Sequence, residues 1–185
     1  MLLIEPCVKS QKAYLKLREA GYDTGITENF KSEFNRFTLK APRLDGRRES
    51  GRGGSESGKT LFVAKPLTKQ EMMHWIKKDE ISLISIDGRN HYLLNESMIS
   101  LVQSVGKFVE LDLSGANSLS IKRVISLSSK LNEDLIVSSC ASNFSDLWPV
   151  LSKISLLALY GASEGDAIMW VTLNPNILLK RMIKA

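Results

Sequence analysis

Basic side chains gather in one polar stretch of the chain, between residues 36 and 59. Five of them, Arg43, Arg47, Arg48, Arg52 and Lys59, stand among glycine and serine residues. A guanidinium can bind two phosphate oxygens at once, and flexible arginine-rich segments often become ordered on RNA. Residues 46–58 contain no apolar side chain, so burial cannot offset the entropy of ordering them. We therefore expect a flexible, exposed loop whose basic residues contact RNA, with a solvated loop of incidental charge as the alternative.

The surrounding composition refines this prediction. No aromatic residue lies between Phe37 and Phe62, which disfavours base stacking and favours contact with the phosphate backbone. Residues 1–78 hold 16 Lys and Arg against 9 Asp and Glu, a net charge of +7, whereas residues 79–185 hold 9 against 11, a net charge of −2. A basic half of this kind suggests a polyanionic partner.

Residues 53–60, Gly-Gly-Ser-Glu-Ser-Gly-Lys-Thr, match the P-loop pattern G-x-x-x-x-G-K-[ST]. That motif requires a buried strand before the loop and a helix after it, so that backbone amides surround the phosphates. Here a polar, basic stretch precedes the loop and the apolar segment Leu61–Ala64 follows it. We interpret the match as a coincidence of composition and not as a nucleotide site.

Four carboxylates, Glu5, Glu28, Asp87 and Asp112, lie at or just beyond the ends of strand-like segments, where they could bind magnesium. The chain has only two histidines, His74 and His91, and lacks the H-x-H, C-x-x-C and H-x-x-x-H spacings of nitrogen- or sulfur-rich metal sites. No G-x-S-x-G elbow surrounds Ser138–Cys140 either. We predict no catalytic residue, no metal and no cofactor; a carboxylate-only magnesium site is the alternative left open.

Apolar segments of strand length recur along the chain and alternate with helical patterns. We expect strands over Leu2–Cys7, Thr24–Thr27, Leu61–Ala64, Ile81–Ile86, Phe108–Leu113 and Leu135–Ser138. Several are almost continuously apolar and end in a polar residue, as in a parallel sheet covered on both faces. Three basic residues follow these strands, namely Lys65, Arg89 and His91. Barrels keep functional residues in the loops at that face, so these three are further candidates for RNA contact.

Helical patterns fill the intervals between the strands. Ala13, Leu17 and Ala20 share one helical face, and Thr68 with Glu71 has the spacing of a capping box. Further helices are expected around residues 121–131 and over 145–160, then from Ser163, and finally from Asn174-Pro175, an N-cap and N1 proline, to about Ile183. Six or seven β/α repeats with a helical end predict one domain over residues 1–185, an α/β fold. A complete (β/α)₈ barrel takes about 250 residues, so we expect an abbreviated or distorted TIM-like barrel.

The chain shows no apolar run near the ~18 residues of a membrane span and no secretory signal, so we expect a cytoplasmic protein without membrane contact. Its two cysteines, Cys7 and Cys140, are far apart in sequence. In a reducing compartment we expect both to be buried free thiols.

Four passages resemble the barrel-type protein subunit of archaeal and eukaryotic ribonuclease P, which is protein component three in archaea and a relative of the polymerase-and-histidinol-phosphatase barrels. The opening Leu3–Cys7 and Ala13–Tyr22 resemble the first strand and helix of that family. The passages Ile81–Asn90 and Phe108–Leu113 resemble later strands, and Ile136–Ala141 with Gly161–Pro175 resembles its ending. Together the passages span nearly the whole chain apart from the loop at about 36–59.

The resemblance implies a noncatalytic role in the maturation of precursor tRNA at its 5′ end. In that family the RNA subunit performs the hydrolysis, while this protein pairs with a small ferredoxin-like subunit and supports the catalytic RNA. One passage departs from the family: where relatives have Asp-Ala-His after the serines of the late strand, this chain has Cys140-Ala141-Ser142. The alternatives are a metal-dependent phosphoesterase that uses Glu5, Glu28, Asp87 and Asp112, and an interaction scaffold without RNA contact.

Overall fold

The structure, a computed structural model, describes residues 1–39, 59–127 and 134–184. In these residues seven parallel strands form one sheet in sequence order. They are β1 (Ile4–Val8), β2 (Thr24–Thr27), β3 (Phe34–Leu39), β4 (Lys59–Ala64), β5 (Ile81–Ile86), β6 (Phe108–Asp112) and β7 (Leu135–Ser138). A single parallel bridge between Val8 and Ala141 joins the first strand to the end of the last. The sheet is thus a nearly closed barrel, which confirms the predicted abbreviated TIM-like fold.

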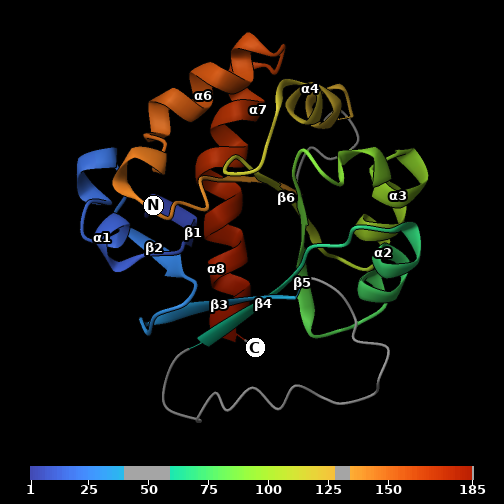
Figure 1. Ribbon diagram of the computed structural model, residues 1–185, viewed down its shortest axis with the longest axis horizontal. Helices are drawn as coiled ribbons and strands as arrows, with labels where there is room; N and C mark the ends of the chain where they lie inside the picture. Colours follow the sequence, from blue (N-terminus) through green and yellow to red (C-terminus); the bar gives the residue numbers. More distant parts are fainter. Residues whose placement is uncertain (40–58, 128–133, 185) are drawn as a thin grey trace.

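Helices surround this barrel on several sides (Figure 1). They are α1 (Gln11–Tyr14), η1 (Arg18–Ala20), α2 (Lys69–Ile76), η2 (His91–Leu93), α3 (Glu96–Ser104), α4 (Ser118–Ser126), η3 (Phe144–Asp146), α6 (Val150–Leu159), α7 (Glu164–Ile168), the π-helix η4 (Met169–Leu173) and α8 (Asn174–Lys184). In Figure 1, α2 and α3 lie together on one side of the molecule and α1 lies on the opposite side.

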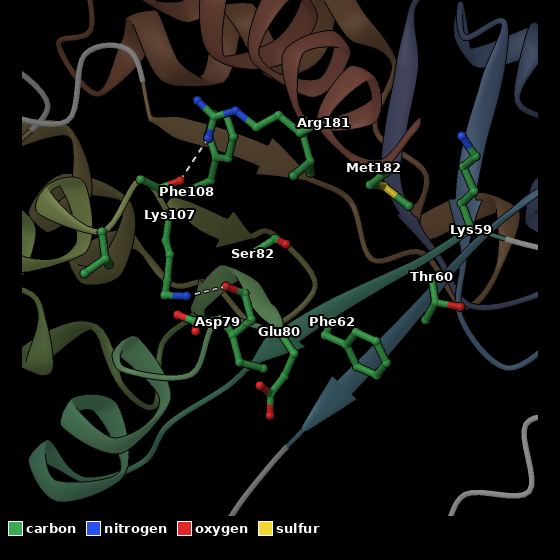
Figure 2. A pocket seen from close by; sticks show the side chains of 14 residues that line it. Lys59, Thr60, Phe62, Asp79, Glu80, Ser82, Lys107, Phe108, Arg181 and Met182 are labelled. Atoms are coloured by element: carbon green, nitrogen blue, oxygen red, sulfur yellow. Dashed lines mark hydrogen bonds between the residues drawn. The ribbon is translucent and has the colours of Figure 1, made fainter. Parts of the chain in front are cut away.

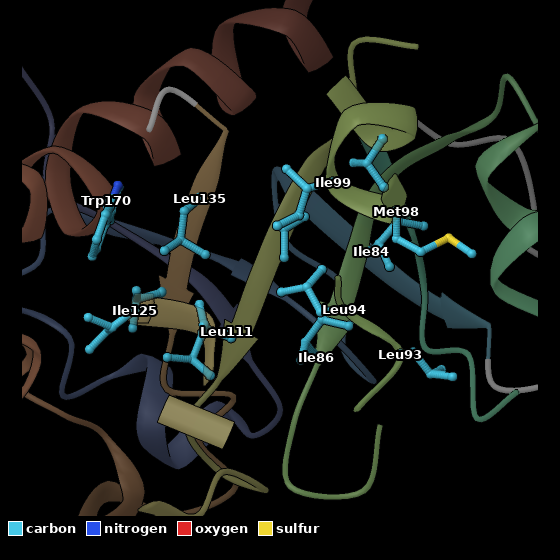
Figure 3. Packing of buried hydrophobic residues seen from close by; sticks show 14 of the residues in the cluster. Ile84, Ile86, Leu93, Leu94, Met98, Ile99, Leu111, Ile125, Leu135 and Trp170 are labelled. Atoms are coloured by element: carbon cyan, nitrogen blue, oxygen red, sulfur yellow. The ribbon is translucent and has the colours of Figure 1, made fainter. Parts of the chain in front are cut away.

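Outward-facing side chains of the strands pack under the helices. Ile84 and Ile86 of β5 meet Met98 and Ile99 of α3, and Leu111 of β6 belongs to the same buried cluster (Figure 3). The cluster continues to Trp170 of η4 (Figure 3). Because helices cover the outer face of these strands, almost every residue of β5 and β6 is buried. This burial explains why near-continuous apolar runs predicted the strands correctly.

The inward-facing side chains change in character along each strand. On β6 they are Phe108, Glu110 and then Asp112, because alternate residues of a strand point to the same face. Phe108 belongs to an apolar cluster at the amino-terminal end, which Leu178 and Leu179 of α8 complete. The barrel is therefore apolar at one end and charged at the other, and α8 covers the apolar end.

Several helix predictions are confirmed by their caps. The Thr68 side chain accepts a hydrogen bond from the Glu71 amide, and Ser163 does the same for the Asp166 amide. Ala13, Leu17 and Ala20 are buried as expected, although a turn divides their segment into α1 and η1.

Two expected helix starts are wrong. The helix expected over 145–160 begins at Val150, because Pro149 separates it from the 3₁₀ turn η3. Asn174 does not cap a new helix: it has helical angles, and its side chain donates to the Leu135 carbonyl at 2.7 Å. Instead α7, η4 and α8 run on without interruption, and the π-helix just before Pro175 accommodates a proline that lacks an amide hydrogen.

The sequence predicts a loop from Arg36, but this residue lies in strand β3, which covers Phe34–Leu39. Both cysteines are buried and free, as predicted. None of the described helices is long and apolar enough to cross a membrane.

Candidate functional site

The carboxyl ends of the strands surround a polar cavity of about 420 Å³. Four basic side chains line it, Lys9, Arg36, Lys65 and Arg89, together with three acidic ones, Glu28, Asp87 and Asp112. We call this region the rim cavity. Its position matches the face where barrels of this type hold their functional residues.

Lys65 lines the rim cavity just beyond the end of β4. Its Nζ donates to Asp112 at 2.6 Å and is paired with Asp87 at 2.8 Å. Burial alone would lower the pKa of Lys65, but the two carboxylates raise it above its ordinary value. The ammonium is therefore held in its charged form, and it occupies the point between the two carboxylates.

Asp87 is the most heavily bonded carboxylate of the rim. Besides Lys65, it accepts from the Arg89 backbone amide at 2.8 Å and from the Arg89 guanidinium at 2.9 Å. Burial acts to raise the pKa of Asp87, and the hydrogen bonds from Arg89 and Lys65 outweigh it, so that the pKa is lowered. The Arg89 side chain is 68% exposed, so it also faces solvent.

Two glycines allow the rim loops to meet closely. The Gly88 amide donates to the Gly115 carbonyl at 2.9 Å. A Cβ on Gly115 would lie 2.6 Å from Asp87 Oδ2, and one on Gly88 would lie 2.8 Å from the Gly115 carbonyl. Side chains at either position would push the loops after β5 and β6 apart and disturb the ion pairs beside them.

Arg36, which lines the rim cavity, forms a buried ion pair with Glu110. The guanidinium donates to both carboxylate oxygens, at 2.5 Å and 2.7 Å, and the Ser138 hydroxyl donates to the same carboxylate at 2.6 Å. Burial would raise the pKa of Glu110, but the charge and hydrogen bonds of Arg36 lower it to about 2. The pair therefore stays ionised at neutral pH.

Glu5 lies apart from the rim cavity and joins the two ends of the sheet. It accepts from the Ser139 amide and hydroxyl, both at 2.8 Å, and from Lys153 of α6 at 2.7 Å. We call these contacts the Glu5 clasp. Glu5 thus has a structural position and is not near the other carboxylates proposed as metal ligands.

The four candidate metal ligands do not converge. Across the described parts of the chain, no three His, Cys, Asp or Glu side chains form a group that could hold a metal ion. Asp87 and Asp112 do come together, but the Lys65 ammonium lies between them. Three of the four acids, Glu5, Asp87 and Asp112, are instead paired with lysine side chains.

The basic residues proposed for RNA contact are divided between the two ends of the barrel. Lys65, Arg89 and His91 lie at the rim, where His91 Nδ1 is 3.1 Å from the Gly88 carbonyl. Lys59 begins β4 at the opposite end, and its ammonium donates to the Ile183 carbonyl. Arg43, Arg47, Arg48 and Arg52 lie outside the described residues.

Sequence reasoning missed two basic residues of the rim cavity, Lys9 and Arg36. Lys9 follows β1 directly, so the rule that selected Lys65 would have selected it as well. Arg36 lies on β3 between Phe34 and Phe37, and the aromatic and β-branched residues of Phe34–Leu39 are the available sequence signal for that strand.

A second cavity, of about 530 Å³, lies at the amino-terminal end beside α8 (Figure 2). Its cations are bound to backbone carbonyls: Lys107 donates to Lys78 and Ile81 at 2.7 Å and 2.6 Å, and Arg181 donates to Gly106 at 2.9 Å. Arg181 also lies over the Phe108 ring (Figure 2). These contacts hold the end of the barrel together, so this cavity is a weaker candidate for anion binding than the rim.

The fold and the rim together define an abbreviated α/β barrel whose rim charges are largely paired with one another. No protein-family model matches the chain, and no curated protein sequence does. Among solved structures, a chain in the cryo-EM structure of an archaeal ribonuclease P with mature tRNA is similar to it, with a TM-score of 0.74. The similarity covers 98% of this chain and 91% of that chain at 10% sequence identity, which establishes a shared fold.

Proposed function

We propose that the chain is a noncatalytic protein subunit of ribonuclease P. The observation that carries the proposal is the fold correspondence with a chain of an archaeal ribonuclease P over 98% of this sequence. The four sequence passages that resemble the barrel-type subunit of that particle lead to the same conclusion by a separate route. The particular subunit that we propose is this barrel-type protein.

The charges at the rim support a noncatalytic role. A metal-dependent phosphoesterase needs carboxylates that are available to a metal, whereas Asp87 and Asp112 share the Lys65 ammonium. A charged lysine repels a divalent cation from the same point. We therefore assign the hydrolysis to the RNA subunit and give this chain a supporting role.

The proposed RNA contacts form two groups. The first group is chosen because its residues are basic and stand in a stretch rich in glycine and serine: Arg43, Arg47, Arg48, Arg52 and Lys59. Lys65, Arg89 and His91 are the second. Within the second group we rank Arg89 highest, because its guanidinium is exposed and keeps further N–H donors, whereas Lys65 is buried between two carboxylates.

The proposal includes three partners: ribonuclease P RNA, precursor tRNA within the assembled particle, and a small ferredoxin-like protein subunit. It places the chain in the cytoplasm. The precursor is bound by the particle as a whole, so the chain by itself is expected to have little affinity for tRNA beyond general attraction between opposite charges.

The test is reconstitution of precursor-tRNA cleavage at low magnesium. The reaction contains the catalytic RNA from the same organism, with and without this chain and its small partner, and a lane with the chain alone. We expect cleavage that depends on the RNA and is stimulated by the chain. Cleavage by the chain alone would instead support a phosphoesterase, and no stimulation in any lane would exclude the proposed role.

A further inference from the structure

The two cysteines of the chain meet where the ends of the sheet join. Cys7 lies in β1, and Cys140 lies just beyond the end of β7. The parallel bridge joins Val8 to Ala141, the residues that directly follow the two cysteines, and the Lys9 amide donates to the Ala141 carbonyl at 2.9 Å. Neighbouring backbones in a sheet lie about 4.8 Å apart, within the Cα separation of about 4.4–6.8 Å that a disulfide spans.

The side chains of the two cysteines interact in the interior of the barrel. The Cys140 Sγ lies 3.4 Å from the Ser138 hydroxyl oxygen, on the inner face that also holds Glu110. Burial raises the pKa of the Cys140 thiol, and a hydrogen bond with the Cys7 side chain raises it further. Such a bond requires the two thiols to be neighbours, although they are far apart in the sequence.

The backbone of Cys140 is unusual at this point. Its φ angle is 44°, in the left-handed region that residues other than glycine seldom adopt. Strained backbone of this kind persists only where the surrounding structure holds it, and it often marks a functional position. Here the surrounding structure is the join itself, since the next residue, Ala141, forms the bridge to β1.

Arg36 interacts electrostatically with both cysteines. Burial would lower the pKa of Arg36, but the charges of Cys7, Glu110 and Cys140 raise it above its ordinary value. A guanidinium stabilises a nearby thiolate, which is the form of cysteine that attacks a disulfide. The pKa of Cys140 is nevertheless raised overall, so the thiol predominates and the pair reacts slowly while the barrel is closed.

A reagent has a route to Cys140. A cavity of about 490 Å³ reaches this residue, with Ser142, Ser145 and Trp148 among the residues that line it. Cys140 is only 1% exposed, so contact with its sulfur requires a local movement. The join is held by one bridge and the Glu5 clasp, so a local fluctuation there costs less than global unfolding.

We propose that Cys7 and Cys140 form a reversible disulfide that ties the two ends of the sheet together, with a low-molecular-weight disulfide such as oxidised glutathione as the oxidant. The Cys140 thiolate attacks one sulfur of the oxidant and releases one glutathione. The Cys7 thiolate then attacks the Cys140 sulfur and releases the second glutathione. The S–S bond of the oxidant is thus reduced, one S–S bond forms in the chain, and the two cysteine protons end on the released thiols.

The disulfide links residues that are distant in sequence, and such a cross-link strongly restricts the unfolded chain. In a reducing compartment the two thiols are the resting form, and the disulfide forms when the oxidant accumulates. The pair therefore makes the strength of the join depend on redox conditions. The inference is independent of the proposed function, because it concerns the isolated chain without RNA.

Incubation of the unaltered full chain in buffers of increasing oxidised-to-reduced glutathione ratio tests the proposal. We expect a monomer that has lost both free thiols and the mass of two hydrogen atoms, and dithiothreitol should restore both thiols. In the oxidised chain, amide exchange at Lys9 should slow at least about tenfold, because the join no longer separates. The urea midpoint should rise by about 1 M or more.

Two variants test the position and the order of reaction. Cys140→Ala/Ser142→Cys keeps two thiols but moves one to an exposed position, so little intramolecular disulfide should form. Cys7→Ala should stop at a mixed disulfide between Cys140 and glutathione, which mass spectrometry detects.

Three results would overturn the proposal. The first is an unaltered chain that keeps both thiols in the most oxidising buffer. The second is an equal yield of intramolecular disulfide from Cys140→Ala/Ser142→Cys, because the juxtaposition at the join would then have no role. The third is a disulfide that leaves both Lys9 exchange and the urea midpoint unchanged.

Discussion

Glu110 and Arg36 face each other in the interior of the barrel, where neither charge is reached by solvent. Removing one partner of such a pair leaves the other charge uncompensated. We predict that Glu110→Gln lowers the free energy of unfolding by about 3 kcal/mol or more, measured by urea denaturation. Glu33→Gln, at an exposed position, is the control and should change stability by no more than about 0.5 kcal/mol.

The same pair predicts a pH dependence. The pKa of Glu110 falls from 4.5 to about 2 on folding, so the unfolded chain takes up the proton first as the pH decreases. The stabilisation is fully present above pH 4.5 and is lost as the pH falls toward about 2. Stability of the unaltered chain should therefore fall more steeply through this window than that of Glu110→Gln. Parallel profiles would mean that folding leaves the pKa of Glu110 unchanged.

Lys65 and Arg89 were predicted from the sequence for the same reason, yet their surroundings differ. Lys65→Met should destabilise the fold, because Asp87 and Asp112 then repel each other. Arg89→Ala should change stability by no more than about 1 kcal/mol, because the Arg89 side chain is 68% exposed and Lys65 still neutralises Asp87, and should weaken RNA binding. Chemical denaturation and RNA titration distinguish the two effects. Loss of RNA binding by a fully folded Lys65→Met variant would reverse the ranking.

At the scale of the elements, α8 closes the apolar end of the barrel with Leu178 and Leu179. Leu178 is fully buried, so Leu178→Ala should cost about 2–5 kcal/mol through lost burial and the cavity left behind. Ile183→Ala, on the same helix but 48% exposed, should cost far less. Equal losses in thermal or urea denaturation would show that α8 is not part of the folded core.

The strands were more predictable than the helices. A strand buried on both faces often leaves an almost continuous apolar run, and several of the six predicted strands carry that signal, for example β5 and β7. Strand β3 lacks such a run, because Arg36 on its inner face pairs with Glu110 and Asn35 exchanges hydrogen bonds with Ser32. Helix α3 is likewise not predicted from the sequence, although the Asn95 side chain caps it by accepting a hydrogen bond from the Met98 amide.

The site was less predictable than the fold, for a physical reason. A residue at or just after the end of a strand is expected at the rim of the barrel. This rule correctly placed Lys65, Arg89, Asp87 and Asp112 at the same end of the barrel. It does not say which charges neutralise one another, because ion pairing depends on distances between different β/α units. Only the three-dimensional arrangement separates an exposed arginine from a lysine bound by two carboxylates.

At the scale of the whole molecule, positive charge is concentrated in the first 78 residues, which carry a net charge of +7. Replacing Arg43, Arg47, Arg48 and Arg52 with alanine should weaken RNA binding. It should also reduce the slope of log K against log salt by about 0.7–0.9 for each lost phosphate contact. The measurement is RNA affinity over a salt series, with two exposed residues as the control: Lys12→Ala on α1 and Lys16→Ala just after it. An unchanged slope would remove the loop from the RNA-binding surface.

The join between β1 and β7 has a consequence for the motions of the barrel. Between neighbouring strands such as β5 and β6, the backbones pair over several residues, whereas one bridge and the Glu5 clasp join the ends of the sheet. Breaking fewer backbone bonds costs less, so this join and the equally short pairing of β2 with β3, at Thr27 and Asn35, are where the barrel opens first. Amide hydrogen exchange should therefore begin at Lys9, whose amide bonds to Ala141, and reach β5 and β6 only on global unfolding. We therefore expect a barrel that is most rigid from β3 to β7, where neighbouring strands pair over several residues, and most easily opened on either side of β1 and β2.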